Sequence, residues 1–470
     1  MRKTTDNPEA SGFDRIVHRL ANLFSPDRLR AYPPTMAICV LLVWAATMAL
    51  GDGLTDRNKV IIGGDFSSFY MGGRYLLEGR LNELYDFVGQ KDFQDALVAP
   101  AQPDDTHPFV NPPFTTILYA PFALTGYVTG LFTWMGFGLI MLLVSLRMLR
   151  NELFDADRLS VGRMLVLTLL FYPTLAWLMY SQNSTITLLL LTTTFLMMRR
   201  GKDLSAGLTL GLLFYKPQLM LAAGMMLLVS RRWRALGGVT LGVAIWTGVG
   251  LLIGSEAMIE YFKLSPRLFE FLRADGSFMG IPFQYPRWGS QSFYGFCILL
   301  FDGFSQRLTN TVATLLTVGG VLAVGAAWLR TPWEPGSRQW DLTAAATLAL
   351  GVLISPHLFV YDLTLLLLPL FIVYSKYPSR STGLAFDGGP LLAATGTLYV
   401  LTFVSSYLAR GQLLLSEWAD APKTALQFST PAIVLWSWVV YRCSRLADSV
   451  IGGDGARTRR GPAPSPSTPA

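Results

Sequence analysis

The stretch MLVLTLLFYPTLAWLMYSQNSTITLLLLTTTFLMM, residues 164–198, contains no charged side chain. A helix that crosses the hydrocarbon core of a bilayer needs about 20 mostly apolar residues, so this run can hold more than one such helix. Further charge-free runs cover 31–51, 108–146, 235–255, 308–329, 342–361, 388–409 and 424–441. The pattern of a membrane-spanning segment therefore repeats along most of the chain.

The composition of the 470 residues excludes the common soluble classes. Hydrophobic residues make up 51% and charged residues only 15%, against about 25% charged residues in soluble domains. A soluble globular enzyme, a disordered chain and a coiled coil are excluded. Three scattered cysteines are too few for a disulfide framework or a zinc site. The expected fold is an all-α polytopic integral membrane protein.

The placement of lysine and arginine sets the predicted topology, since cytoplasmic loops carry an excess of these residues. We expect the cytoplasmic side to hold the basic clusters in 1–33, 147–163, 199–202, 231–234, 330–338, 376–380 and 442–445. Large external loops then fall at 51–112 and 254–307, and both termini are cytoplasmic. The predicted organisation is a cytoplasmic segment 1–33, a membrane domain 34–446 with about twelve membrane helices, and a disordered tail 447–470. No cleavable signal peptide is visible, so the first apolar segment is expected to be an uncleaved anchor.

Two segments require interrupted helices. Residues 113–146 must cross the membrane once but exceed one span at about 1.5 Å per residue. We interpret 113–124 as a re-entrant or interfacial helix, followed by a crossing at 126–146. Both ends of 204–229 are expected on the cytoplasmic side, so this segment must rise and return in two short legs that turn at Lys216-Pro217. Such helices are tolerated at membrane depth where they line protein or a water-filled cavity.

The external loop 51–112 contains a Gly-Gly-Asp sequence beside a predicted helix. Residues 67–79 have helical spacing and end at a glycine, and 91–98 has the pattern of a second short amphipathic helix of the kind that lies along a membrane surface. Asp65 follows Gly63-Gly64 at the start of the first helix. Helix capping is the common role of an aspartate in this place, whereas the two glycines permit close approach of a ligand.

Short motifs occur in a fixed order along 60–375. They are Gly64-Asp65-Phe66 with Tyr70, Leu77-Glu78-Gly79 with Leu84-Tyr85-Asp86, Asn111-Pro112-Pro113-Phe114 with Ala120-Pro121-Phe122, Gln182-Asn183, Ala206-Gly207 with Lys216-Pro217-Gln218, Arg231-Arg232-Trp233-Arg234, and Ser355-Pro356-His357 with Tyr361-Asp362. In these motifs and in its topology the chain resembles glycosyltransferase family 87, the polyprenyl-phosphate-mannose-dependent transferases of the GT-C superfamily. It departs from the family pattern at Ser181, where a glycine is usual, and at Asn111, where an aromatic residue is common.

The resemblance implies an inverting transfer of a hexose on the external membrane face. The donor would be a polyprenyl-phosphate sugar, with mannose as the family's best-known choice, and the acceptor a hydroxyl of a glycolipid or polysaccharide. The resemblance points to Asp65 as the catalytic base. The chemistry agrees, because the attacking hydroxyl must lose a proton, whereas a phosphate leaving group needs positive charge rather than an acid.

Three basic residues are candidates for binding the donor phosphate or sugar. Lys216 is the first, since a lysine between two apolar legs is expensive in a membrane, although it can also snorkel to the interface. His357 is the second, with an ordinary interfacial histidine as the alternative. Arg287 lies beside Trp288 in the second external loop and could bind phosphate bidentately. Asp362 lies in an apolar run and is expected to pair with Lys216 or Arg287.

Other residues have supporting or weaker predicted roles. Gly64, Tyr70, Gln182 and Asn183 are expected to support the site. His107, in the first external loop, is interpreted as structural or acceptor-facing. No metal site or cofactor is expected, since the three histidines lie far apart and no Walker loop, HExxH or CxxC motif occurs. Asp155-Ala156-Asp157 matches a DxD motif but is interpreted as solvated charge in a short cytoplasmic loop.

Two other classes of function remain open from the sequence. A transporter or lipid flippase would use Lys216, His357 and Asp362 as pathway charges. A carrier places such residues near the midplane of repeat-related helices, and no internal repeat is visible. The other class is a receptor-like or assembly protein without catalysis. The expected location is the bacterial inner membrane, with a lipid or glycan acceptor and no nucleic-acid partner.

Overall fold

The computed structural model describes residues 26–154, 159–376 and 389–457. Its helices, in chain order, are α2 (Pro26–Ala49), α3 (Phe66–Leu77), α4 (Phe87–Val98), α5 (Thr116–Ala123), α6 (Tyr127–Leu153), α7 (Val161–Leu169), α8 (Tyr172–Tyr180), α9 (Ser184–Arg199), α10 (Asp203–Gly211), α11 (Leu221–Val229), α12 (Trp233–Leu264), α13 (Leu268–Phe271), α14 (Phe293–Phe301), α15 (Gln306–Leu329), α16 (Arg338–Ile354), α17 (Leu367–Ser375), α18 (Gly389–Trp418) and α19 (Ser429–Arg457). The predicted all-α class is confirmed.

Short 3₁₀ helices and one small sheet complete the described elements. The 3₁₀ helices are η1 (Leu81–Glu83), η2 (Pro113–Thr115), η3 (Leu212–Tyr215), η4 (Pro217–Met220), η5 (Ser265–Arg267), η6 (Arg287–Gly289) and η7 (Val360–Leu366). Strands β1 (Ser277–Phe278) and β2 (Ile281–Pro282) pair antiparallel, with Ser277 opposite Pro282.

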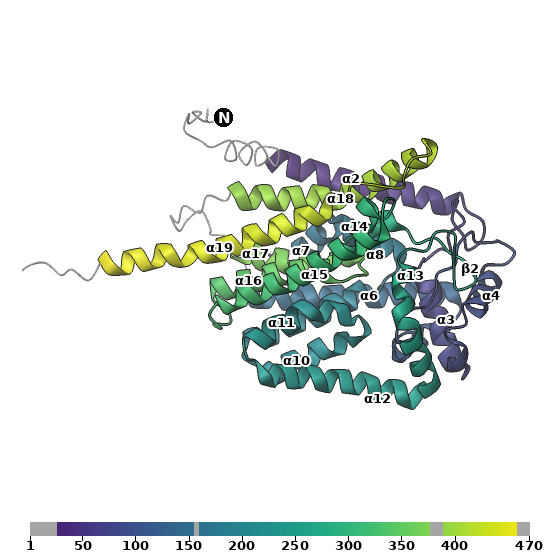
Figure 1. The fold of residues 1–470 in the computed structure, drawn as a ribbon, viewed down its shortest axis with the longest axis horizontal. Coiled ribbons are helices and arrows are strands. Elements are labelled where there is room, and N and C mark those ends of the chain that lie inside the picture. The colour runs from purple at the N-terminus through teal and green to yellow at the C-terminus, as the bar shows by residue number, and fades with distance from the viewer. Residues whose placement is uncertain (1–25, 155–158, 377–388, 458–470) are drawn as a thin grey trace, which may run out of the picture.

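The long helices form a bundle in which their axes run in nearly one direction (Figure 1). Among the described residues, five helices are long and apolar enough to cross a membrane, or six if the pair α7 and α8, bent by 77°, forms one span. The five segments are Ala31–Ala49, Tyr127–Leu153, Trp233–Phe271, Gln306–Leu329 and Ala393–Trp418. The protein is therefore a helical membrane protein, and the count of about twelve membrane helices stays a prediction.

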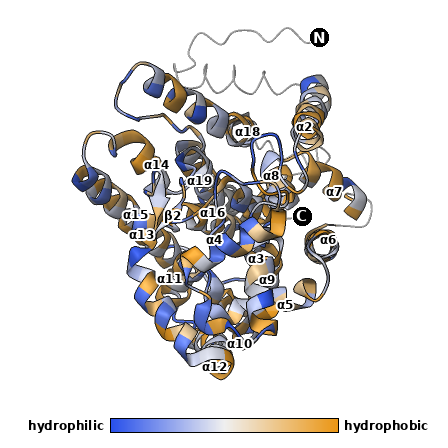
Figure 2. Ribbon diagram, turned by 90° about the vertical axis from the view of Figure 1, so that its right-hand side faces the viewer, coloured by the Kyte–Doolittle hydropathy of each residue, from blue (hydrophilic) through white to orange (hydrophobic). Residues whose placement is uncertain are grey.

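The short helices of the two large loops gather at one end of the bundle. In Figure 1, α3, α4, α13 and β2 lie at the right-hand end, and beyond α12 the chain turns across this end toward α13. Helix α12 changes direction at Gly254, whose backbone is not helical. Figure 2, which looks onto this end, shows α3 and α4 over the middle of the bundle and α2 at its edge. The loops thus form a cap over the ends of the long helices.

The interrupted segments take the predicted form. Residues 113–123 form η2 and α5 before the long helix α6, and residues 203–229 form two legs that turn at Lys216-Pro217. Close packing of α10 against α12 holds the first leg. A β-carbon added to Gly207 would lie 1.8 Å from the carbonyl oxygen of Ala235, and one added to Gly211 would lie 2.4 Å from that of Val239. Glycines on α10 therefore let the two backbones approach.

The C-terminal helix is longer than predicted. α19 continues to Arg457, so 447–457, assigned from composition to a disordered tail, is helical in the structure. Extending an existing helix adds one hydrogen bond for each residue fixed, which is far easier than starting a helix. Residues 458–470 lie outside the described residues, as does the Asp155-Ala156-Asp157 sequence.

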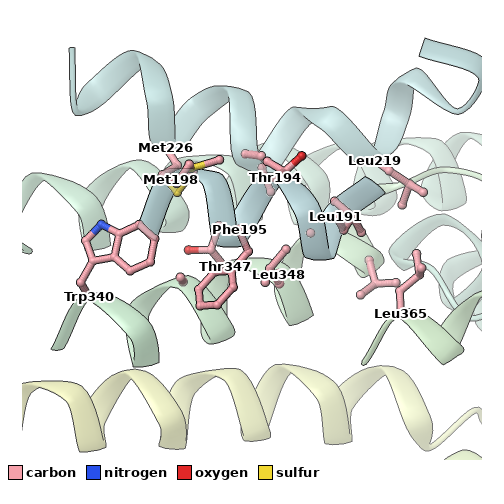
Figure 3. Close-up of a pocket in the computed structure, with 15 residues that line it drawn as sticks. Leu191, Thr194, Phe195, Met198, Leu219, Met226, Trp340, Thr347, Leu348 and Leu365 are labelled. Carbon is pink, nitrogen blue, oxygen red and sulfur yellow. The ribbon is translucent and has the colours of Figure 1, made fainter. Parts of the chain in front are cut away.

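A small cavity lies inside the bundle, between α9, α11 and α16. Its volume is about 40 Å³, and its walls are mostly apolar side chains such as Leu191, Phe195, Leu219 and Met226 (Figure 3). This space holds a few water molecules at most. It is therefore too small for a sugar, and the candidate site lies elsewhere.

Candidate active site

A larger cavity opens at the capped end of the bundle. Its volume is about 290 Å³, close to the lower limit of about 300 Å³ for small-molecule sites. The polar side chains in its wall include Asp65, His107, Gln182, Lys216 and His357. Aromatic side chains form much of the remaining wall: Phe69, Tyr180, Tyr215, Tyr261, Phe269, Phe271, Phe283, Tyr285, Phe359 and Tyr361. Residues from distant parts of the sequence thus meet in one space.

Asp65 stands at the N-terminus of α3 but does not cap it. Its backbone is helical, with φ −63° and ψ −16°, and its side chain makes no capping hydrogen bond. The two preceding residues, Gly63 and Gly64, have φ of +95° and +52°, conformations that favour glycine. A β-carbon on Gly64 would lie 3.4 Å from Tyr180. The glycine turn therefore brings the backbone close to α8 and leaves the Asp65 carboxylate available to the cavity.

Both oxygens of the Asp65 carboxylate have a hydrogen-bond partner. His107 Nδ1 lies 3.2 Å from Oδ1, and Gln182 Nε2 donates to Oδ2 at 2.7 Å. The side chain of Asp65 remains 25% exposed. Burial opposes its ionisation, but the hydrogen bonds and charge of His107 and the hydrogen bond of Gln182 hold the pKa of Asp65 below its usual value. Asp65 is therefore an oriented, ionised carboxylate at a cavity wall.

The loop between α8 and α9 carries Gln182. Ser181 adopts a left-handed conformation, with φ +50° and ψ +42°, at the end of α8. Two indole groups hold this turn, since Trp134 Nε1 donates to the Ser181 carbonyl and Trp177 Nε1 to the Gln182 carbonyl, each at 2.6 Å. Gln182 Nε2 also donates to the Tyr361 hydroxyl at 3.2 Å. The amide that contacts Asp65 is thus fixed on several sides.

Lys216 reaches the cavity from the turn between the two short legs. Its Nζ lies 2.9 Å from Asp362 Oδ1, and the side chains of Lys216 and Asp362 are only 12% and 4% exposed. Ser184 Oγ donates to the same carboxylate oxygen at 2.8 Å. Of the two partners predicted for Asp362, Lys216 and Arg287, the structure shows Lys216. One of the three ammonium donors is used by Asp362, so the others can serve a ligand.

His357 lies in the loop between α16 and η7. Its Nδ1 is 3.1 Å from the Tyr285 hydroxyl, and its carbonyl accepts a hydrogen bond from Ser355 Oγ at 2.7 Å. The segment around Ser292 also supports this loop, because Ser292 Oγ donates to the Pro356 carbonyl at 3.0 Å. Burial lowers the pKa of His357 below its ordinary value, so this imidazole is neutral at pH 7.

Not every predicted site residue reaches the cavity. Arg287 is absent from its wall and donates instead to the Arg273 carbonyl at 2.6 Å. The Tyr70 hydroxyl donates to the Thr125 carbonyl at 2.8 Å. Asn183 is buried and donates to the Tyr119 hydroxyl at 3.0 Å. Tyr70 and Asn183 therefore have structural contacts near the site, and Arg287 is tied to another residue of its own loop, 254–307.

His107, interpreted from the sequence as structural or acceptor-facing, contacts Asp65 directly. One available signal was the scarcity of histidine, since the chain has three and two of them line this cavity. Tyr180 and Tyr285 were not singled out as site residues, because aromatic residues are common at membrane borders. Among the described residues, no group of three or more His, Cys, Asp or Glu side chains is arranged to hold a metal ion.

The geometry defines a class of protein: a helical membrane protein with a polar cavity under a cap of short helices. The sequence profile of glycosyltransferase family 87 matches residues 109–356, more than half of the chain, and the chain belongs to this family. The matched range contains Gln182 and Lys216, whereas Asp65 and His107 precede it and His357 follows it directly. No curated protein matches the chain, and no solved structure does.

Proposed function

We propose that this glycosyltransferase moves a hexose, with mannose as the first candidate, from a polyprenyl-phosphate donor to a hydroxyl of a glycolipid or polysaccharide. The observation that carries the proposal is the Asp65 carboxylate, which has a donor on each oxygen and still faces the cavity. An ionised carboxylate oxygen has two lone pairs. Each oxygen can therefore accept a proton from an incoming hydroxyl while its present hydrogen bond persists.

The proposed reaction is a single displacement at the anomeric carbon. The acceptor oxygen attacks this carbon as Asp65 takes the hydroxyl proton, and the bond between the carbon and the phosphate oxygen breaks. The bonding electron pair leaves with the polyprenyl phosphate, which gains one negative charge. The configuration at the anomeric carbon is inverted. One carboxylate is sufficient because the phosphate leaves without being protonated, unlike the leaving group in glycoside hydrolysis.

Lys216 is proposed to receive the charge that develops on the phosphate. Lys216 lines the cavity, and its Nζ is held by Asp362. Fixed charges in a partly desolvated site stabilise a developing charge more than water does, because they need not reorient. Asp362 thus acts by holding the ammonium group in place rather than by contacting the sugar.

His357 is proposed to contact the same phosphate or the sugar. Its imidazole is neutral and its Nδ1 faces the Tyr285 hydroxyl, so the tautomer that carries hydrogen on Nε2 can donate to an anion. Aromatic walls such as Tyr261 and Phe269 suit the apolar faces of sugar rings and the first isoprene units. The imidazole donor and the aromatic wall together would suit a ligand that carries both an anion and a sugar.

The proposed location is the bacterial inner membrane, with the cavity on the external face and both termini in the cytoplasm. Support comes from the direction of three short helical segments. α9, α11 and η7 with α17 begin beside the cavity and end at Arg199, at Arg231-Arg232 and at Lys376. Since basic residues favour the cytoplasmic side, the opposite, cavity-bearing end would be external.

The direct test is sugar transfer by purified protein in lipid vesicles. The protein would be incubated with polyprenyl-phosphate mannose or glucose, labelled in the sugar, and with extracted membrane glycolipids. The proposal predicts a labelled glycolipid or glycan whose new linkage has the anomeric configuration opposite to that of the donor. A product with the donor's configuration, or movement of intact donor between leaflets without any transfer, would contradict it.

A further inference from the structure

We propose that His107 is a positioning residue that holds the Asp65 carboxylate in its reactive orientation, and that two glutamines of α4 fix His107 in turn. The inference deepens the proposed function and rests on it for the role of Asp65. It starts from the direction of the contact between His107 Nδ1 and Asp65 Oδ1, at 3.2 Å. An ionised carboxylate only accepts hydrogen bonds. The hydrogen therefore lies on Nδ1, and His107 donates.

This direction excludes a simple relay through Nδ1. A nitrogen that already carries hydrogen cannot take the proton that Asp65 receives from the acceptor. Burial works against a charged imidazole, but the hydrogen bond and charge of Asp65 raise the pKa of His107 above its ordinary value. The two residues thus favour each other's ionised forms. His107 acts by holding Asp65 ionised and by fixing one of its two oxygens.

The α4 helix holds His107 by its backbone. Gln94 Nε2 donates to the His107 carbonyl at 2.8 Å, and the His107 N–H donates to Gln94 Oε1 at 3.0 Å. One turn earlier, Gln90 Oε1 accepts from the Phe109 N–H at 2.8 Å. Residues four apart lie on one helix face. Gln90 and Gln94 therefore bind alternate residues of the 107–109 segment, much as a neighbouring strand would.

The intervening residue fits this arrangement. Pro108 has no N–H to satisfy, and the two glutamines serve the residues on either side of it. Both glutamine side chains are buried, with residue exposures of 0% for Gln90 and 1% for Gln94. A buried amide is retained where its hydrogen bonds are made. This pair of amides therefore holds the end of a loop that contains three charged or proline residues between 102 and 106: Pro103, Asp104 and Asp105.

Several other groups act on the same pair. Those that influence Asp65 electrostatically are His357, Tyr119, Tyr180, Tyr285 and Tyr361. The charge of Asp105 also favours the protonated form of His107. His107 and Gln182 are the two that donate hydrogen bonds to Asp65. Burial raises the pKa of Asp65, and the hydrogen bond from His107 lowers it. If this donor is removed, the pKa of Asp65 must therefore rise.

The test follows the ionisation of Asp65 in the absence of substrate. The carboxylic-acid infrared band of purified, detergent-solubilised protein is recorded against pH, and Asp65→Asn assigns the band. We expect His107→Leu to raise the midpoint by about one pH unit or more, because the donor is lost. His107→Asn, whose amide places a donor near the position of Nδ1, should restore most of the wild-type midpoint. An unchanged midpoint in His107→Leu would overturn the proposal.

Transfer kinetics form the second readout. In His107→Leu, the acid limb of the kcat profile should move in the same direction, with kcat at neutral pH reduced roughly 10- to 100-fold and the acceptor KM nearly unchanged. Gln94→Glu, which loses the donor to the His107 carbonyl, should shift the profile in the same sense. Asp92→Asn, on the exposed side of α4, is the control and should shift neither readout.

The two readouts separate this inference from the proposed function. A raised infrared midpoint supports the contact even if no sugar transfer is found, in which case the proposed function alone fails. In the opposite case, His107→Leu lowers sugar transfer but shifts neither the pH profile of kcat nor the infrared midpoint. That result indicates only a loss of folded protein, and it overturns the positioning role.

Discussion

Two aspartates of the first large loop, residues 51–112, show how much a single side chain depends on distant residues. Asp86 precedes α4 and caps it, accepting hydrogen bonds from the Val88 and Gly89 N–H groups. Asp65 precedes α3 in the same way but accepts from residues 42 and 117 positions away in sequence. Local pattern alone favours capping for both. The difference between them arises from tertiary contacts, which the sequence pattern does not contain.

The pairing of Lys216 with Asp362 leads to a prediction about charge. Lys216→Met should reduce transfer roughly 100-fold or more, because the phosphate loses its cation. It should also destabilise the protein by about 3–5 kcal/mol, since the buried Asp362 carboxylate loses its partner. Thermal unfolding and transfer of labelled sugar would be measured on the same preparation.

A double variant separates these two effects. Lys216→Met with Asp362→Asn removes both charges, so most of the lost stability should return while transfer stays low. Wild-type transfer in the double variant would exclude Lys216 from phosphate stabilisation.

At the scale of elements, the sequence predicted the interrupted segments better than their packing. The proline pair marks the start of the segment formed by η2 and α5, and the Lys216-Pro217 turn separates η3 from η4. Proline favours such positions because it lacks the N–H that the interior of a helix uses. The approach of α10 to α12 was not predicted. This approach requires that Gly207 and Gly211 lie on the face of α10 that meets Ala235 of α12. Charge and hydropathy patterns do not show which faces of two helices meet.

Alanine at two glycines of the short legs should have opposite effects. Gly207→Ala places a β-carbon against the Ala235 carbonyl and should destabilise the protein by about 1–3 kcal/mol. It should also lower transfer, because α10 carries the chain to Lys216. Gly224→Ala, on the returning leg α11, meets nothing within 4 Å and should be neutral or stabilise by up to about 1 kcal/mol. Equal thermal unfolding of both variants would show that α10 and α12 do not pack as described.

The turn before Gln182 offers a stabilising substitution. Ser181 has a positive φ of +50°, a conformation that costs a side-chain-bearing residue about 1 kcal/mol relative to glycine. Ser181→Gly, which restores the residue usual in the family, should therefore raise stability by about that amount without reducing transfer. Differential scanning fluorimetry in detergent checks this, and a lower melting temperature would contradict the left-handed turn.

At the scale of the molecule, composition was enough to predict a helical membrane protein. The number of spans was harder to predict, because several apolar segments form helices of 9 to 17 residues, shorter than one span needs. Charge-free length alone does not distinguish such a helix from a full crossing. The site was predicted in part, since Asp65, Gln182, Lys216 and His357 meet in one cavity, whereas the contact with His107 depends on how the loop 99–112 folds back.

The orientation of the whole molecule is open to a labelling test. Cys39 is exposed and would first be replaced by serine. Cys297 and Cys443 are buried. A new cysteine at Lys59, an exposed position in the first large loop, should react with a membrane-impermeant maleimide in intact spheroplasts. A cysteine at Lys202, exposed at the opposite end, should react only after the membrane is opened. The reverse pattern would place the cavity in the cytoplasm and exclude an external donor site.

The most direct measurement of the central claim compares two aspartate variants in one assay. Asp65→Asn and its matched control Asp86→Asn would be assayed for transfer of labelled sugar from polyprenyl-phosphate mannose to membrane glycolipids, at equal amounts of folded protein. We predict a loss of at least about 100-fold in Asp65→Asn, as expected for removal of a general base, and near-normal transfer in Asp86→Asn, which caps a helix. Undiminished transfer by Asp65→Asn would contradict the assignment of this carboxylate as the base.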